Sequence, residues 1–177
     1  MRILNAIIYC IEYFNFHRLI NKKGLMKMKN NHAKRVDIVS LKMIREGSIL
    51  YGNRRIHEPD DVLEIFEDLL ESSDREKLIV CCLNSKNEPT NISVVSIGSL
   101  NSSIVHPREV FKTAIISNAA SIIIAHNHPS GDITPSKEDI DITERLKESG
   151  KIIGVPLLDH LIVGNKKYMS LKEEGYI

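Results

Sequence analysis

The chain has 177 residues, 42 % of them hydrophobic and 27 % charged, with a formal net charge of +1. This length suits one domain, or one domain with a tail, and the composition excludes a disordered or collagen-like chain. Three cysteines, Cys10, Cys81 and Cys82, are too few for a disulfide framework. Because the sequence has no secretory cleavage pattern either, we expect a reducing, cytoplasmic location.

The first 35 residues differ from the rest in charge, since they carry eight Lys or Arg and only one acidic residue, Glu12. We interpret residues 1–35 as a basic leader, either disordered or added by a misassigned start, because later methionines offer alternative starts. Clustered Lys and Arg also suit nucleic-acid binding, since they release counterions from a polyanion. The apolar stretch 3–20 is interrupted by Glu12 and Arg18, so it predicts no membrane span.

Residues 36–177 are expected to form one α/β domain. Residues 36–43 alternate apolar and polar side chains, which predicts a half-buried strand, and a short hairpin is expected to close near Ile56. Apolar spacing and turn residues then predict, in chain order, a helix from Pro59, strands over 77–83 and 90–100, a helix from Pro107, a strand over 120–125, a helix from 134 or 135 that stops at Gly150, and strands over 155–164 and near Tyr168. The wholly apolar run 120–125 predicts a central strand. The predicted fold class is α/β, with a mixed β-sheet flanked by helices.

Two histidines follow directly on the predicted central strand, in the segment AHNHPSGD. His126 and His128 are two residues apart, so on extended backbone both side chains leave the same face and can converge. The turn-rich residues after them allow the chain to bring Asp139, at the start of the next helix, beside the imidazoles. Two histidines and one carboxylate leave one position of a tetrahedral zinc ion open, which is typical of a catalytic zinc site.

The residues around Asp139 also have an ordinary structural interpretation. Ser136 and Asp139 have the S-x-x-D spacing of a helix capping box, and Thr134 before Pro135 is a second candidate N-cap. A histidine at a strand end is by itself more often structural than a ligand. The metal-site prediction therefore depends on the complete pattern H-x-H-x(7)-S-x-x-D.

The segment AHNHPSGDITPSKEDIDIT resembles the signature of the RadC family, whose domain is similar to the JAB/JAMM (MPN+) zinc metalloproteases. The resemblance covers about residues 60–174 and includes the segments VSIGSLN, HPREVF and LLDHLIVG. It implies a JAB/MPN (cytidine deaminase-like) architecture, a zinc ion, and hydrolysis of a peptide or isopeptide bond. It also implies that His126, His128 and Asp139 bind the zinc and that Ser136 is the serine of the motif.

The same family uses a glutamate from an earlier strand as its general base. Glu76 is our candidate, because it directly precedes the predicted strand 77–83. Glu109 is the competing glutamate, but at a helix start its ordinary role is to complement the helix dipole. In the implied mechanism Glu76 takes a proton from the attacking water, and Ser136 donates a hydrogen bond to the developing oxyanion.

Three further polar residues are candidates to orient the ligand imidazoles: Asp132, Asp159 and His160. Their structural alternative is turn capping for Asp132 and strand packing for the other two. The sequence favours neither role.

Three other functions fit parts of the sequence. A zinc nucleobase deaminase needs H-x-E followed by P-C-x-x-C, and the second motif is missing, while the adjacent Cys81 and Cys82 point to opposite faces of a strand. A DNA-repair or other nucleic-acid accessory protein is the main alternative, but residues 1–60 show no helix-hairpin-helix motif of the full-length family, so DNA binding would depend on residues 1–35. A metal-binding module without turnover is the third, although the motif residues are all retained.

Overall fold

The computed structural model describes residues 35–70, 73–98 and 105–177, and Leu41–Ile177 form one unit. Residues 1–34 of the predicted leader lie outside the described residues. The strand predicted over residues 36–43 is wrong, because these residues form no regular structure and their side chains are exposed. Alternation with a period of two produces a strand only where a neighbouring strand supplies hydrogen bonds and a core covers one face. The expected hairpin is also wrong, since Ile56 N–H instead donates to the Asn87 carbonyl at 2.9 Å.

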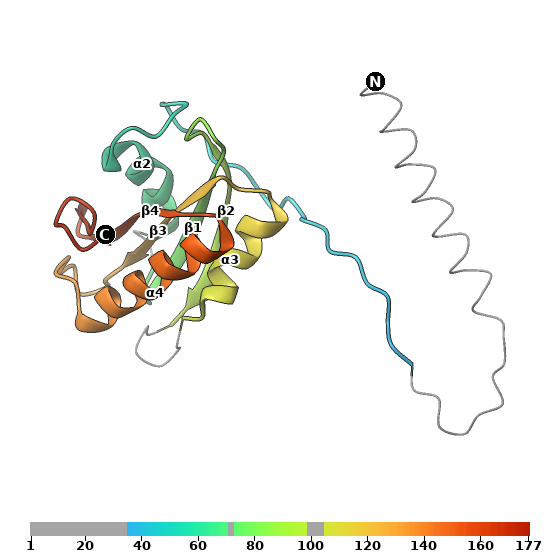
Figure 1. Ribbon diagram of the computed structural model, residues 1–177. Coiled ribbons are helices and arrows are strands. Elements are labelled where there is room, and N and C mark those ends of the chain that lie inside the picture. The colour runs from blue at the N-terminus through green and yellow to red at the C-terminus, as the bar shows by residue number, and fades with distance from the viewer. Residues whose placement is uncertain (1–34, 71–72, 99–104) are drawn as a thin grey trace, which may run out of the picture. The chain divides into compact units, whose positions relative to one another are not determined.

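Five strands form one mixed sheet in the order β2-β1-β3-β4-β5 (Figure 1). These strands are β1 (Lys77–Leu83), β2 (Pro89–Ile97), β3 (Ser121–Asn127), β4 (Leu157–Gly164) and β5 (Lys167–Ser170). β3 pairs in parallel with β4, and the other three pairs are antiparallel. The predicted α/β class with a mixed sheet is confirmed, and so is the central position of the apolar strand.

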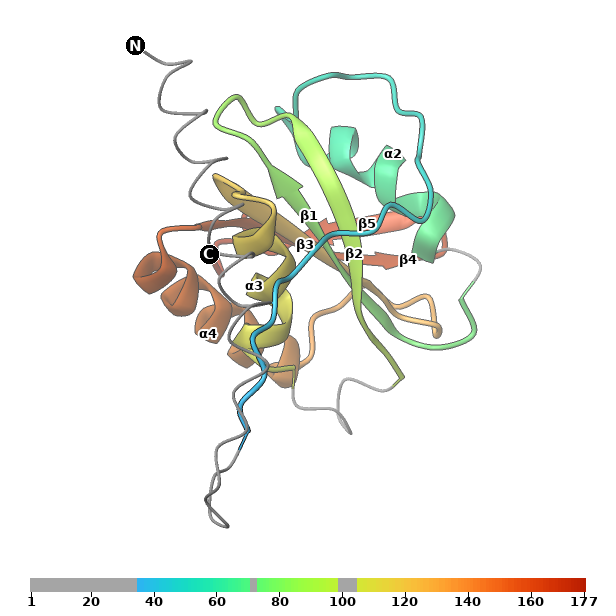
Figure 2. The same cartoon turned by 90° about the vertical axis from the view of Figure 1, so that its right-hand side faces the viewer.

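Helices cover both faces of this sheet (Figure 2). α2 (Pro59–Leu70) packs on one face, while α3 (Pro107–Ile116) and α4 (Lys137–Ile153) pack on the other. Adjacent strand residues belong to different cores, because successive side chains point to opposite sides of a strand. Cys81 accordingly lies in the core under α2, and Cys82 in the core under α3 and α4.

α4 runs past Gly150, where we predicted it to stop, and ends at the C-cap Gly154. Gly154 has a φ of 79°, the left-handed conformation that commonly ends a helix. Gly150 is buried inside the helix, where an added Cβ would lie 2.6 Å from the Val155 carbonyl oxygen. Glycine at position 150 therefore permits a close approach between α4 and the segment that leads into β4.

We expect Gly150→Ala to destabilise the protein, although alanine is the better helix former by about 1 kcal/mol. The new methyl group would also lie 3.2 Å from Phe111 Cζ and 3.3 Å from Leu157 N, so α4 would have to shift. Overpacking of this kind costs about 1–3 kcal/mol, which outweighs the gain in helix propensity. Urea unfolding measures the difference, with Glu148→Ala at an exposed position of α4 as the control. An unfolding free energy at or above that of the wild type would contradict the expected clash.

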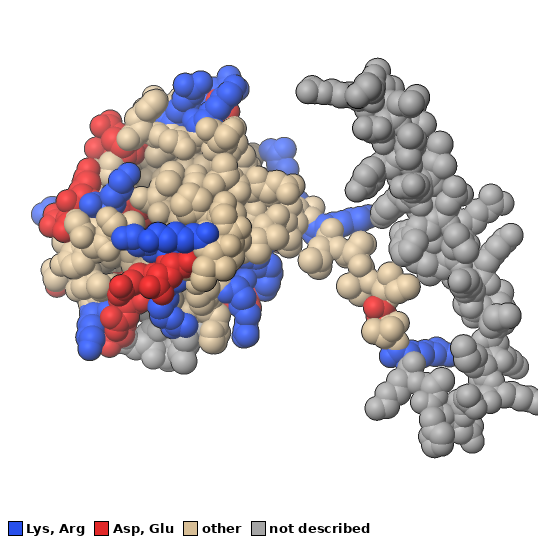
Figure 3. Space-filling view, in the orientation of Figure 1, with Lys and Arg blue, Asp and Glu red and all other residues tan. Residues whose placement is uncertain are grey.

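No helix among the described residues has the length and apolar character needed to cross a membrane. Lys and Arg side chains lie next to Asp and Glu on the face shown in Figure 3, and much of that face is uncharged. Charges of the described residues are thus mixed on this face and not sorted by sign.

Candidate metal centre

Three side chains of the predicted site come together at the end of β3: His126, His128 and Asp139. The end of β3 presents both histidines on the face that α4 covers, and Asp139 lies in the first turn of α4. A parallel β3–α4–β4 connection starts its helix beside the carboxyl end of the first strand, which explains why Asp139 meets the imidazoles. One potential ligand atom of each residue lies within 4.8 Å of the others.

The spacing of these atoms suits the ligands of a single small ion. His126 Nε2 lies 2.9 Å from His128 Nε2 and 3.3 Å from Asp139 Oδ1, and His128 Nε2 lies 3.5 Å from Asp139 Oδ2. Ligand atoms about 2.0–2.1 Å from a tetrahedral zinc ion are about 3.3 Å apart. Two nitrogen donors and one oxygen donor at these distances could therefore hold a metal ion, and they fit zinc.

The site is buried on one side and reaches solvent on the other. His126 and Asp139 are buried, whereas the His128 side chain is 16 % exposed. Burial lowers the pKa of His126 to about 4, although the charge of Asp139 opposes this shift. The hydrogen bond with Asp139 raises the pKa of His128, against the effect of burial. The site therefore presents a neutral His126 at neutral pH, as a metal ligand must be.

The carboxylate of Asp139 remains ionised despite its environment. Burial alone would raise its pKa, but the hydrogen bond with His128, the charge of His126 and the hydrogen bonds from Ser136 together hold it well below its usual range. Asp139 therefore supplies a negative charge to the site throughout the neutral range.

Ser136, and not Thr134, is the N-cap of α4, which resolves the alternative left open by the sequence. Ser136 Oγ accepts a hydrogen bond from the Asp139 N–H at 3.1 Å. Asp139 Oδ2 in turn accepts from the Ser136 N–H at 2.8 Å and from its hydroxyl at 2.6 Å. The capping box therefore orients the carboxylate that the predicted metal site needs.

The Nδ1 atoms of both histidines are bound within the fold, which leaves each Nε2 to face the site. His128 Nδ1 lies 2.6 Å from the backbone carbonyl oxygen of Asp132. His126 Nδ1 lies 2.8 Å from His160 Nε2. Asp132 thus contacts the imidazole through its backbone, because its carboxylate accepts a hydrogen bond from Thr134 N–H instead.

Asp159, the third residue expected to orient the imidazoles, is not brought to them. Its carboxylate accepts hydrogen bonds from the His160 N–H at 2.7 Å, the Ser170 hydroxyl at 2.7 Å and the Lys172 N–H at 3.2 Å. These bonds tie β4 to the turn that follows β5.

Glu76 directly precedes β1, at a position that the sheet register places opposite His128. Leu78 pairs with His126 in the antiparallel β1–β3 ladder, and two residues farther out this register places Glu76 opposite His128. The charge of Glu76 contributes to the raised pKa of His128. Glu109, the competing glutamate, lies in the first turn of α3, where its carboxylate contacts Lys112 and Arg108.

Asn127, between the two histidines, is a site residue that the sequence analysis missed. Its side-chain carbonyl accepts a hydrogen bond from the Lys77 N–H at 2.8 Å, and its amide donates to the Arg75 carbonyl at 3.1 Å. These two bonds fasten the residues on both sides of Glu76 to the end of β3. Its place in H-N-H was the available signal, but the sequence does not show that the side chain reaches a segment 50 residues away.

A hollow of about 250 Å³ lies beside His128, between α2 and the ends of β3 and β4. Its walls include apolar side chains of α2 and β4, namely Leu63, Leu70 and Val163. Asn127 and His128 form the part of the lining that borders the metal-ligand group. A substrate segment placed in this hollow would therefore lie next to the candidate site.

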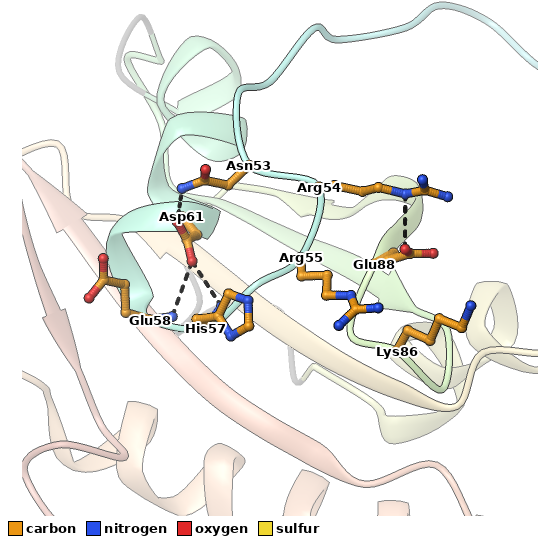
Figure 4. Close-up of a pocket in the computed structure, with 8 residues that line it drawn as sticks. All are labelled: Asn53, Arg54, Arg55, His57, Glu58, Asp61, Lys86 and Glu88. Carbon is orange, nitrogen blue, oxygen red and sulfur yellow. Dashed lines mark hydrogen bonds and ion pairs between the residues drawn. The ribbon is translucent and has the colours of Figure 1, made fainter.

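A larger hollow of about 530 Å³ lies at the other end of β1, between residues 53–58, the start of α2 and the β1–β2 turn (Figure 4). Arg54 pairs there with Glu88 at 2.9 Å. Asp61 accepts hydrogen bonds from the Asn53 amide and from two backbone N–H groups, those of His57 and Glu58. These contacts hold residues 53–58 against α2 and the β1–β2 turn, so the polar groups that line this hollow have a structural role.

Comparison with known proteins connects this site to a family. The family model of the RadC-like JAB domain matches residues 56–176. The chain belongs to the RadC family. The match includes β3, α4 and all three residues of the candidate metal centre, and it confirms the resemblance inferred from the sequence.

Relatives of this RadC-family chain are found in archaea and bacteria. A UPF0758 protein of Methanosarcina barkeri is 44 % identical over 163 residues, which are 92 % of this chain and 70 % of that protein. A UPF0758 protein of Clostridium botulinum is 54 % identical over 148 residues, which are 82 % of this chain and 65 % of that protein. The matched part of the chain thus corresponds to 65–70 % of the length of these relatives.

Proposed function

We propose that this RadC-family protein is a zinc-dependent metallohydrolase that cleaves an amide bond in a peptide or isopeptide substrate. The observation that carries the proposal is the group of His126, His128 and Asp139, whose ligand atoms lie within 4.8 Å of one another at the end of β3. Three protein ligands and an open fourth position are the arrangement of a catalytic zinc site, whereas structural zinc sites have four protein ligands.

Each residue then has a definite task. His126 and His128 would hold the zinc ion through Nε2, and Asp139 through its carboxylate. A zinc ion held by these residues would make the attacking water more acidic and would polarise a substrate carbonyl. Glu76, beside His128, accepts a proton from the attacking water as the water oxygen forms a C–O bond with the substrate carbonyl carbon. Glu76 then passes this proton to the amine nitrogen, and the amide C–N bond breaks.

Ser136 is proposed to stabilise the oxyanion that forms on the substrate carbonyl. Its hydroxyl donates to Asp139 Oδ2 at 2.6 Å in this structure, so the side chain must rotate about χ1 to reach a substrate. The Ser136 N–H keeps its own bond to Asp139 Oδ2, at 2.8 Å, when the hydroxyl turns. The carboxylate therefore stays oriented during this change.

The hollow beside His128 supports a peptide as the substrate class. Leu63 offers an apolar contact, and Glu67, Asn127 and Lys166 line the same hollow with polar or charged groups. A short extended segment that carries both apolar and polar groups suits a lining of this kind.

The zinc content of the purified protein tests the proposal. Elemental mass spectrometry should find about one zinc per wild-type chain and no bound zinc in His126→Ala or Asp139→Ala, because two remaining ligands hold zinc poorly. His57→Ala, which removes an exposed histidine outside the site, should bind zinc like the wild type. Circular dichroism shows whether each variant is folded. A folded wild type that contains no zinc and takes up none when it is supplied would overturn the proposal and favour a binding role.

A further inference from the structure

A buried series of hydrogen bonds lies behind His126, on the side away from the candidate metal centre. His126 Nδ1 lies 2.8 Å from His160 Nε2, and His160 Nδ1 lies 2.6 Å from Thr143 Oγ1. Thr143 Oγ1 is in turn 2.5 Å from the backbone carbonyl oxygen of Asp139. The two histidines are 0 % exposed and Thr143 is 1 % exposed, so these groups depend on one another for hydrogen bonds.

The chemistry of the groups allows one direction of donation. A carbonyl oxygen only accepts hydrogen bonds, so the Thr143 hydroxyl must donate its one hydrogen bond to the backbone carbonyl oxygen of Asp139. Thr143 Oγ1 can then only accept from His160, which places a proton on His160 Nδ1. An uncharged buried imidazole carries one proton, so His160 Nε2 accepts and His126 Nδ1 donates. His126 Nε2 is left with a lone pair that faces His128 and Asp139.

The reverse direction would disable the site. With the proton of His160 on Nε2, that atom would donate to His126 Nδ1, and the proton of His126 would move to Nε2. A protonated Nε2 has no lone pair for a metal ion. The end of the series, at Thr143, therefore decides whether His126 can serve as a ligand.

We propose that Thr143 is a positioning residue for the metal centre, whose hydroxyl acts through His160 to hold His126 in the Nδ1–H tautomer. This inference rests on the proposed function, because it assumes that His126 is a metal ligand. It extends that function to two residues that touch neither the metal position nor a substrate. Outer hydrogen bonds to ligating histidines change metal affinity by about 10–100-fold.

The fold explains why one helix contributes twice to the site. The buried positions of α4 include Asp139, Thr143, Leu146 and Gly150, which form a stripe at intervals of three or four residues. Thr143 follows Asp139 by one helical turn and faces β4, where His160 pairs with Ile124, two residues before His126 on β3. α4 thus provides one ligand and also sets the tautomer of another.

Two substitutions at Thr143 separate the hydroxyl from the shape of the side chain. Thr143→Val removes the hydroxyl at nearly constant shape, and we expect its zinc affinity to fall by about 10–100-fold. Thr143→Ser retains the hydroxyl and should bind zinc close to the wild-type affinity. Competition with a chromophoric chelator measures both, and Thr113→Val in α3 is the matched control. Equal losses in the valine and serine variants, or no loss in either, would overturn the proposal.

The tautomers can be read directly from metal-free protein by long-range proton–nitrogen correlation spectra of isotope-labelled imidazoles. We expect Nδ1–H forms of His126 and His160 in the wild type and in Thr143→Ser, and Nε2–H forms in Thr143→Val. An Nε2–H form of His126 in the wild type would overturn the proposal, even if Thr143→Val does not fold. If neither the wild type nor any variant binds zinc, that result counts against the proposed function. The tautomers of the wild type would still show whether Thr143 sets the protonation of His160 and His126.

Discussion

Glu76→Gln is expected to lower the rate of amide hydrolysis by about 10²–10⁴-fold, while the protein still binds one zinc ion. Glutamine keeps the size of the side chain and one carbonyl oxygen, but it cannot accept the proton that the attacking water must lose. Asn127 holds the backbone on both sides of residue 76 through Lys77 N–H and the Arg75 carbonyl, so the substitution should leave the site in place.

The measurement combines turnover and metal content. Wild type and variants are compared on a panel of peptide and isopeptide substrates, and zinc is determined on the same preparations. Glu109→Gln is the matched control, because it makes the same chemical change at an exposed glutamate that contacts Arg108 and Lys112. A wild-type rate in Glu76→Gln, or a comparable loss in Glu109→Gln, would contradict the assignment of Glu76 as the general base.

The metal-free protein is expected to lose stability steeply as the pH falls below about 6.5. Burial lowers the pKa of His126 to about 4 and that of His160 well below its ordinary value of 6.5. In the unfolded chain both rings return to their ordinary pKa. Between pH 6.5 and about 4 the unfolded chain therefore binds a proton that the folded His126 does not, and the free energy of unfolding falls by about 1 kcal/mol per pH unit, with a further loss from His160.

Two neighbouring groups do not cancel this loss. The pKa of His128 is raised, so its stabilising contribution is complete below the unfolded pKa and disappears only as the pH rises. The pKa of Asp139 is lowered, so its contribution is lost only in stronger acid, below its unfolded value of 3.8. The window from pH 6.5 to about 4 thus belongs to His126 and His160.

Urea unfolding of metal-free protein at a series of pH values measures this effect. His57→Gln, at an exposed histidine, should show the same dependence as the wild type, whereas His160→Gln should show a shallower one. An unfolding free energy that stays level from pH 6.5 to pH 5 would mean that the buried rings are charged in the folded protein.

Much of the architecture was predictable because its causes are local. The apolar residues of α2 recur at helical spacing after Pro59, and the all-apolar run in β3 can be covered only at the centre of a sheet. The spacing of His126 and His128 likewise determines that both leave the same face of a strand. The family resemblance of the motif then pointed to Asp139 as their partner.

Where the sequence analysis was wrong, the deciding contact lies outside the segment concerned. Residues 36–43 have the alternation of a strand but no strand beside them among the described residues. Glycine is a residue that commonly ends helices, but Gly150 lies inside α4, where the Val155 carbonyl approaches the helix. The helix continues to Ile153. Neither an alternating pattern nor a single glycine shows which other segment of the chain will pack against it.

By itself, the sequence determined the fold class, the order and type of the helices and strands from Pro59 onward, and the convergence of His126 and His128, because spacing along a strand or helix sets direction. Only the tertiary structure decided which groups surround them. Asn127 reaches back to β1, and Thr143 meets His160 because the parallel β3–α4–β4 connection lays α4 across β4. The direction of a hydrogen bond depends on the partner at its far end, and that partner is chosen by packing between elements distant in the chain.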